Sequence, residues 1–251
     1  MGVVTDIDIS IHVEVKKVFQ ILKRCNPNLF LSAERFPCDK MIDVAVMASG
    51  GGTDFQSIID ASESGTIDAE VKLLITNNPE AYCIERAKKH DIDHHVIDHR
   101  DKERREHEKE INETLQSYDP DLIVLAGYMR ILTDEFVDKH HGKMINIHPA
   151  LLPLFGGKGM YGKKVHEAVL DAGMKRTGCS VHFVTSEVDG GPIIDQRCVP
   201  VKEKDDSHTL AERVKEKEHE LLPSVVGAFA EGRVKLQDGK AAIVPEKDNN
   251  S

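Results

Sequence analysis

One segment near the start of this chain predicts its architecture: Ile42-Asp43-Val44-Ala45-Val46-Met47-Ala48-Ser49-Gly50-Gly51-Gly52-Thr53. The run 42–48, apolar except for Asp43, is typical of a strand that is buried on both faces. Three glycines follow it, and a helical pattern then extends from Thr53 to Ser64. A buried strand that turns through glycines into a helix is how βαβ units begin, so we expect a parallel sheet.

The alternation of strand and helix repeats along the chain. Further strands are predicted at 71–75, 94–97, 122–126 and 144–147, and further helices at 79–90, 101–118 and 133–140. Because the connections are short, these strands should form a mostly parallel, Rossmann-like sheet with helices on both faces. The sequence therefore predicts the α/β class.

The pattern changes after Pro149. The predicted elements beyond it are a helix at 163–172, longer strand-like runs at 179–185 and 192–201, and a long helix at 210–230. Two strand-like runs without a helix between them indicate an antiparallel C-terminal extension of the sheet. We expect Ser207 to cap the long helix and Pro223 to bend it. The pair Asp238-Gly239 separates two short apolar runs, which predicts a hairpin.

The sequence divides into three parts. Residues 1–40 precede the first predicted strand and form an N-terminal extension of unknown role. They are either accessory or translated sequence upstream of the true start, with a functional extension as the alternative. Residues 41–245 form the predicted α/β domain. Residues 246–251 are polar and acidic, which is typical of a disordered tail.

Composition argues against several classes of protein. The chain has 251 residues, a formal net charge of −10 and no long basic run, so it is poorly suited to neutralise the phosphates of a nucleic acid. No apolar run approaches the length of a membrane span. The five cysteines lack the spacing of metal ligands or redox pairs, which predicts reduced thiols in a cytoplasmic protein. They are Cys25, Cys38, Cys83, Cys179 and Cys198.

The most reactive side chains are predicted at the end of the strand 144–147. Residues two apart in a strand point to the same side, so Asn146 and His148 should project together where Pro149 ends the strand. The carboxylate of Asp189, in a Gly-Gly-Pro loop, is expected to orient the imidazole and raise its pKa. Such a set suits a reaction that builds negative charge on a carbonyl oxygen. A purely structural histidine is the alternative.

The glycine loop 49–52 is a candidate phosphate site. Glycines let the backbone approach a ligand closely, and the free amides of the following helix attract an anion. A plain tight turn and a dinucleotide site are the alternatives. The glycine spacing is not Gly-x-Gly-x-x-Gly, and the next strand ends in Thr76-Asn77-Asn78 rather than an acidic residue, which disfavours a dinucleotide.

Five motifs occur in a characteristic order and spacing. They are Ala48-Ser49-Gly50-Gly51-Gly52-Thr53, Leu125-Ala126-Gly127-Tyr128-Met129-Arg130-Ile131-Leu132, Asn146-Ile147-His148-Pro149-Ala150-Leu151-Leu152-Pro153, Ser180-Val181-His182-Phe183-Val184 and Asp189-Gly190-Gly191-Pro192. Together they resemble the folate-dependent glycinamide ribonucleotide formyltransferases of purine synthesis. The resemblance extends from Met41 to about Val244.

This resemblance implies a formyltransferase fold and a reaction. The formyl group of 10-formyltetrahydrofolate, a co-substrate, would pass to the amine of glycinamide ribonucleotide. Asn146 would donate to the developing oxyanion, and protonated His148 would do the same or deliver a proton. Asp189 would hold His148 charged and oriented. The resemblance implies no metal, and it implies small-molecule partners rather than nucleic acid or membrane, with a monomer or homodimer as the assembly.

The resemblance also implies two groups of binding residues. The ribonucleotide would be held by Gly51, Gly52, Thr53, Asp54 and Glu218. The folate would be held by Arg104, Met129, Arg130, Ile131, Leu132 and Asn146.

Some positions depart from the family pattern. Most members carry asparagine where Asp54 stands, and glutamine is common where Lys215 stands, so whether either residue contacts substrate is open. The loop 156–162 is expected to be a mobile segment near the active site. His166 is expected on the surface of a helix.

Three other functions are alternatives to this one. A formyltetrahydrofolate hydrolase shares the three catalytic residues, but it usually has His-His-Ser-Phe after the Asn-Ile pair, whereas Pro149-Ala150-Leu151 follows His148 here. A methionyl-tRNA formyltransferase would need a further C-terminal domain. A catalytically silent folate- or nucleotide-binding protein is the third alternative, and a turnover assay separates it from an enzyme.

Overall fold

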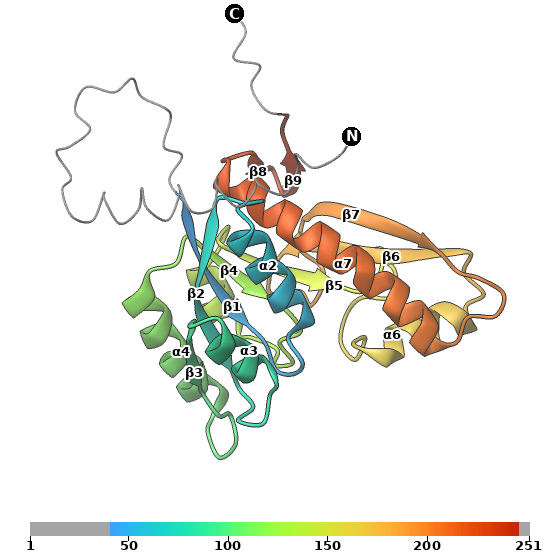
Figure 1. Cartoon of the computed structure of the whole chain (residues 1–251). Coiled ribbons are helices and arrows are strands. Elements are labelled where there is room, and N and C mark those ends of the chain that lie inside the picture. Colours follow the sequence, from blue (N-terminus) through green and yellow to red (C-terminus); the bar gives the residue numbers. More distant parts are fainter. Residues whose placement is uncertain (1–40, 246–251) are drawn as a thin grey trace, which may run out of the picture. The chain divides into compact units, whose positions relative to one another are not determined.

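The computed structural model describes residues 41–245 (Figure 1). The predicted N-terminal extension, 1–40, and the predicted disordered tail, 246–251, lie outside the described residues. Within them, a seven-stranded sheet is the centre of the fold, in the order β3-β2-β1-β4-β5-β6-β7. The strands are β1 (Ile42–Met47), β2 (Ala69–Thr76), β3 (Asp93–Val96), β4 (Leu122–Leu125), β5 (Met144–His148), β6 (Arg176–Phe183) and β7 (Ile193–Pro200).

The strand directions agree with the sequence. Strands β1 to β5 pair in parallel, and β6 and β7 extend the sheet in antiparallel fashion. A separate antiparallel pair joins β8 (Val234–Gln237) to β9 (Lys240–Ile243). Its turn places Asp238 at φ 51° and Gly239 at φ 71°, the two positive values that a type I′ hairpin turn requires. The predicted fold class and hairpin are both confirmed.

Six helices of the described region cover the sheet. They are α2 (Thr53–Glu63), α3 (Cys83–Lys89), α4 (Arg104–Tyr118), α5 (Asp134–Lys139), α6 (Lys163–Asp171) and α7 (Ser207–Ala230). Residues of β1 alternate between two apolar cores: Val44 and Val46 pack with α2, α3 and α7, whereas Ala45 and Met47 pack with α4 and α5. Both faces of the sheet are therefore covered, which explains why residues 44–47 of β1 are all apolar.

Several predicted boundaries were wrong for local reasons. Helix α3 begins at Cys83 instead of 79, because Asn78 first forms a turn that its side chain stabilises by accepting from the amide of Glu80. Helix α7 is capped by Asp206, whose side chain accepts from the amide of Thr209, and Ser207 is already its first helical residue. Pro223 lies inside α7, and the helix continues through it.

The strand order creates the crevice in which open α/β sheets bind ligands. From β1 the chain moves to β2 on one side of β1, and it later returns to β4 on the other side of β1. The loops that follow β1 and β4 therefore lead away in opposite directions and leave a crevice between them. These loops are joined by hydrogen bonds: the amide of Ser49 donates to Gly127 O at 3.1 Å, and the amide of Met129 donates to Ser49 Oγ at 2.8 Å. Strand β5 ends beside this crevice.

Candidate active site

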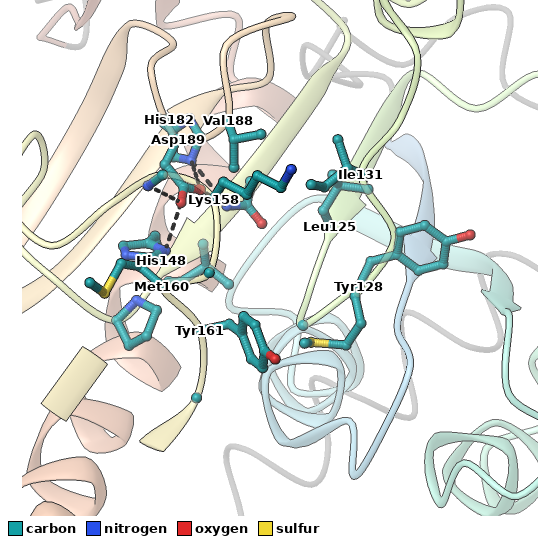
Figure 2. A pocket seen from close by; sticks show the side chains of 18 of the residues that line it. Leu125, Tyr128, Ile131, His148, Lys158, Met160, Tyr161, His182, Val188 and Asp189 are labelled. Carbon is teal, nitrogen blue, oxygen red and sulfur yellow. Dashed lines mark hydrogen bonds and ion pairs between the residues drawn. The ribbon is translucent and has the colours of Figure 1, made fainter. Parts of the chain in front are cut away.

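Asn146 and His148 are two apart in β5, so they lie on the same side of the strand, and both line one cavity. Figure 2 shows His148 in this cavity, next to Asp189. The strand ends at His148, and Pro149 follows, as the sequence predicted. Asp189 approaches from the loop between β6 and β7, at φ 57°. Aspartate is among the few residues other than glycine that adopt this left-handed conformation readily. The loop packs closely against β6 at Gly191, where a side chain would overlap the carbonyl oxygen of Phe183.

The carboxylate of Asp189 is the centre of the site. Its Oδ2 lies 3.5 Å from His148 Nδ1 and accepts from the amide of Gly157 at 2.9 Å. Its Oδ1 accepts from Asn146 Nδ2 at 3.4 Å and lies 3.7 Å from His182 Nε2. The three residues predicted as catalytic therefore meet within hydrogen-bond or ion-pair distance. Their roles in turnover stay a prediction.

Burial and the charge of Asp189 shift the pKa of His148 in opposite directions. Burial lowers the pKa of the imidazole below its ordinary value, and this outweighs the opposite effects of Asp189 and of the hydrogen bond to Phe155 O. The sequence-based expectation of a raised pKa was wrong, because it considered the carboxylate but not the loss of water around a ring that is 4% exposed. Both neighbours are hydrogen-bond acceptors, so they still favour the protonated ring once a proton is supplied.

Asp189 itself is held in its charged form. Burial opposes ionisation of the carboxyl group, but His182, His148 and the amide of Gly157 together keep its pKa below the ordinary value. At neutral pH the site therefore contains a carboxylate next to an imidazole whose pKa lies below its ordinary value.

His182 is a site residue that the sequence analysis quoted without assigning a role. On β6 it pairs with Asn146 of β5 in register. Its Nδ1 carries a hydrogen and donates to Phe183 O at 2.9 Å, so in the neutral ring Nε2 accepts from Asn146 Nδ2 at 3.0 Å. Its ring thus orients the amide of Asn146. Its alternation with Ser180 along an apolar strand, opposite Asn146, is the signal that points to this contact.

The cavity has a volume of about 660 Å³, within the range typical of small-molecule sites. One wall is the loop after β4, in which Met129 and Ile131 are 50% and 41% exposed despite their apolar side chains. Lys158 and Tyr161 come from the loop before α6 and line the cavity opposite this wall (Figure 2). Exposed apolar groups that face a cavity suit a flat, partly apolar ligand.

The glycine loop lies next to the cavity and has the features of an anion site. Gly51 O accepts from Arg86 Nε at 2.8 Å, and Gly50 O accepts from the amide of Cys83 at 3.0 Å. Within residues 41–245, the amides of Gly51, Gly52 and Thr53 have no hydrogen-bond acceptor, as expected for the start of a helix. The carbonyl groups are thus fixed and the amides are available to a ligand.

Asp54 and Glu218 bring two carboxyl groups to the end of the cavity nearest this loop. Glu218 is 9% exposed, and burial together with the nearby Asp54 raises its pKa well above the ordinary value. Burial also raises the pKa of Asp54, against the opposing effects of His219 and Lys215. Asp54 and Glu218 line the cavity, whereas Gly51, Gly52 and Thr53 do not.

Comparison with known proteins bears on what this arrangement does. A family model described as "Formyl transferase" matches residues 42–226. The chain belongs to the formyl transferase family. It is 41% identical over 204 residues to phosphoribosylglycinamide formyltransferase of Haemophilus influenzae, which covers 81% of this chain and 94% of that protein. Glycinamide ribonucleotide transformylase 1 of Symbiobacterium toebii superposes with a TM-score of 0.79 at 36% identity, over 85% of this chain and all of that one.

Other proteins to which this chain is similar differ in length or in the reaction that their names give. The trifunctional purine biosynthetic protein adenosine-3 of Bos taurus is 43% identical over 82% of this chain, but the chain spans only about a fifth of that relative's length. A formyltetrahydrofolate deformylase from Pseudomonas syringae has a TM-score of 0.74 at 26% identity, over 81% of this chain and 66% of that one.

His166 and Arg104 differ in their relation to the cavity. His166 was expected on a helix surface, and this was wrong: it is 4% exposed, lines the cavity from α6, and its Nδ1 has no hydrogen-bond partner among the described residues. Arg104 is the exposed first residue of α4 and does not line the cavity. Its contact with folate stays a prediction.

The described region has two further properties. Among residues 41–245, no group of three or more His, Cys, Asp or Glu side chains is arranged to hold a metal ion. None of the helices in that region is long and apolar enough to cross a membrane.

Proposed function

We propose that this protein transfers the formyl group of 10-formyltetrahydrofolate to the amine of glycinamide ribonucleotide, a step of de novo purine synthesis. One observation carries the proposal: Asn146, His148 and Asp189 meet at one cavity, whose lining includes the loop 129–132 and the carboxyl groups of Asp54 and Glu218. We assign the part formed by the loop 129–132, the apolar half, to the folate, and the part beside the glycine loop, the carboxyl-lined half, to a phosphorylated sugar.

The two substrates occupy opposite halves of the cavity. The loop 129–132 supplies apolar side chains and backbone groups for the pterin. The free amides of Gly51, Gly52 and Thr53 hold the phosphate at the start of α2, and Glu218 accepts from the ribose hydroxyls. Both substrates then reach the centre of the cavity, so that a reaction between two dilute molecules becomes one between two groups held in place.

The chemistry proceeds through a tetrahedral intermediate. The amine nitrogen forms a bond to the formyl carbon, and negative charge moves to the formyl oxygen. The Nδ2 group of Asn146 donates to that oxygen; its N–H toward Asp189 is available, because the bond is long at 3.4 Å. Protonated His148 stabilises the same oxygen, and the charge of Asp189 stabilises the imidazolium.

Collapse of the intermediate completes the transfer. The bond between the formyl carbon and the folate nitrogen breaks, that nitrogen takes up a proton from His148, and the proton that the substrate amine loses returns to the imidazole. His148 would deliver its proton through Nε2, which lies against Phe155 O and must leave it for the substrate, while Asp189 beside Nδ1 favours the protonated ring. Tetrahydrofolate and the formylated ribonucleotide are the products.

The proposal includes the cellular compartment and the oligomeric state of the protein. We place the reaction in the cytoplasm, since Cys83, Cys179 and Cys198 are free thiols. The protein acts as a monomer or homodimer, which sedimentation of the purified chain distinguishes.

Release of tetrahydrofolate, followed with and without glycinamide ribonucleotide, tests the proposed reaction against the alternatives. A transferase releases folate only when the amine is present. Release at the same rate without the amine would mean a hydrolase, as in the related deformylase. Binding of both ligands without any release would mean a catalytically silent protein.

A further inference from the structure

The loop between β4 and α5 forms one wall of the cavity and has no regular structure of its own. Met129 and Ile131 of this loop are exposed, and Ile131 lies across the cavity from His148 (Figure 2). Within the described part of the chain, the amides of Arg130, Ile131 and Leu132 donate no hydrogen bond. The position of this wall therefore depends on how the two ends of the loop are held.

Each end of the loop is held by a side chain from elsewhere in the fold. At the first end, the amide of Met129 donates to Ser49 Oγ at 2.8 Å. At the second end, Glu108 Oε1 accepts from the amide of Thr133 at 2.7 Å, and Glu108 Oε2 accepts from the Thr133 hydroxyl group. Thr133 Oγ1 also accepts from the amide of Phe136 at 3.3 Å and so caps α5. Glu108 therefore fixes the residue at which the loop ends and the helix begins.

Glu108 is an acidic side chain in an apolar environment. It is 4% exposed and lies on the buried face of α4 with Ile111 and Leu115, which pack into the core on this side of the sheet. Removing such a side chain from water costs free energy unless its oxygens accept hydrogen bonds. In the described region both donors belong to Thr133. The hydrogen bonds that compensate for the burial of Glu108 are therefore the ones that hold the end of the loop.

We propose that Glu108 is a positioning residue for folate binding, which acts through Thr133 to keep the loop 129–132 in the conformation that the folate requires. Glu108 does not line the cavity, so it acts without touching either substrate. This inference rests on the proposed function and adds to it. A loop that adopts its binding conformation for only a fraction of the time binds its ligand more weakly in proportion to that fraction.

Three variants of the full-length chain test the role of Glu108. Glu108→Ala removes both accepting oxygens. Glu108→Gln keeps the shape, and its carboxamide can accept from the Thr133 amide and donate to the Thr133 hydroxyl oxygen. Asn112→Ala is the matched control, because Asn112 lies one turn further along α4 and its Oδ1 is 2.7 Å from His140 Nε2. His140 is at the opposite end of α5 from the loop, so this variant loses a contact between the same two helices away from the cavity.

The measurements are KM for each substrate, Kd for tetrahydrofolate alone, and hydrogen exchange of the Thr133 amide by NMR. Glu108→Ala should raise the KM for the folate and the Kd for tetrahydrofolate roughly tenfold, as expected from the loss of two hydrogen bonds. The ribonucleotide KM should stay within about twofold. The Thr133 amide should exchange at least about tenfold faster, because its acceptor is gone. Glu108→Gln and Asn112→Ala should stay within about twofold of the wild type in all these measurements.

Thr133→Ala provides a second test that keeps Glu108 in place, should Glu108→Ala fail to fold. It removes the hydroxyl group but leaves the amide bonded to Glu108, and Thr133 does not line the cavity. The folate KM should rise about threefold, as expected from one lost hydrogen bond, with the ribonucleotide KM unchanged. An unchanged folate KM in Thr133→Ala would overturn the inference.

Three further outcomes would overturn it. In Glu108→Ala, the folate KM could stay unchanged, or both KM values could rise equally. Asn112→Ala could weaken folate binding as much as Glu108→Ala, which would show a general effect of loosening α4. Glu108→Gln could be as impaired as Glu108→Ala, which would show that the bonds to Thr133 are not what Glu108 contributes. Failure of the proposed function looks different, since the wild type itself would then release no tetrahydrofolate in response to the ribonucleotide.

Discussion

Nδ1 of His148 lies 3.5 Å from Oδ2 of Asp189, where β5 ends beneath the loop between β6 and β7. The two residues are 41 positions apart in sequence, and antiparallel pairing of β5 with β6 brings them together. The carboxylate is already held by the amide of Gly157 and faces His182, so it is a fixed charge. A preorganised charge of this kind favours protonation of the imidazole as the reaction builds an oxyanion.

Asp189→Asn tests this pairing. Asparagine tolerates the positive φ of the loop and keeps one accepting oxygen, so the fold should persist. The His148 pKa, already below about 6.5 because of burial, should fall further, and kcat should drop roughly a hundredfold with little change in either KM. Imidazole titration by NMR and single-turnover rates measure both effects.

The double variant with His148→Ala is the matched control for that experiment. It should be little slower than His148→Ala alone, because the carboxylate acts through the imidazole. Fully additive losses, or an unchanged His148 pKa in Asp189→Asn, would contradict the pairing and leave Asp189 as a turn residue only.

The pH dependence of turnover follows from the same contact. Because burial lowers the His148 pKa, the protonated ring becomes scarcer as pH rises through that lowered value. The single-turnover rate, divided by the fraction of the substrate amine that is unprotonated, should therefore fall as pH rises from 5 to 8, if protonated His148 stabilises the oxyanion. A corrected rate that increases over this interval, at saturating amounts of both substrates, would assign the ring to the role of a base.

His182 should act as a positioning residue for Asn146. His182→Phe keeps the volume of the ring but removes the atom that accepts from Asn146 Nδ2. We expect kcat to fall about tenfold, the value of one lost hydrogen bond in the transition state, with both KM values within about twofold. An equal loss of thermal stability and activity would show that the histidine supports only the fold.

Gly51 and Gly52 differ in how much space a side chain would find at each position. A side chain at Gly51 meets nothing within 4 Å, so Gly51→Val should fold normally and raise the KM for the ribonucleotide more than that for the folate. Gly52 has φ 67°, and a Cβ there would lie 2.6 Å from Cys83 Cβ, so Gly52→Ala should cost roughly 1–3 kcal/mol of stability. A normal melting temperature in Gly52→Ala would contradict this assignment.

Deletion of residues 1–40 should leave turnover nearly intact. The first strand of the sheet starts at Ile42, and every residue assigned to the site lies beyond it. Melting temperature and kcat of the truncated protein measure this. A large loss of either would show that the extension supports the domain.

Much of the fold was predictable because neighbouring residues give several signals that agree. The apolar residues of β1 predict a strand, the glycines after it predict a turn, and the pattern from Thr53 predicts a helix. Errors arose at helix starts. At α7, both Asp206 and Ser207 are suitable caps, and only the position of Thr209 decides between them.

The site was predictable where the spacing of residues within one strand decides which side chains lie together. It was less predictable where contacts come from distant segments. Asn146 and His148 share a face because they are two apart in a strand. The pKa of His148 could not be derived in this way, since burial depends on loops that are distant in sequence. His166 was misplaced for the same reason. A histidine in a helix with many polar residues is expected to be exposed, and only the fold shows that His166 is buried beside the cavity.

The fate of the formyl carbon tests the central claim most directly. Folate carrying a ¹³C-labelled formyl group is mixed with the full chain and glycinamide ribonucleotide, and the products are followed by NMR. The account predicts that the label appears in the formamide of the ribonucleotide as tetrahydrofolate is released, and that no label moves without the amine. Label that appears as free formate, with or without the amine, would contradict it.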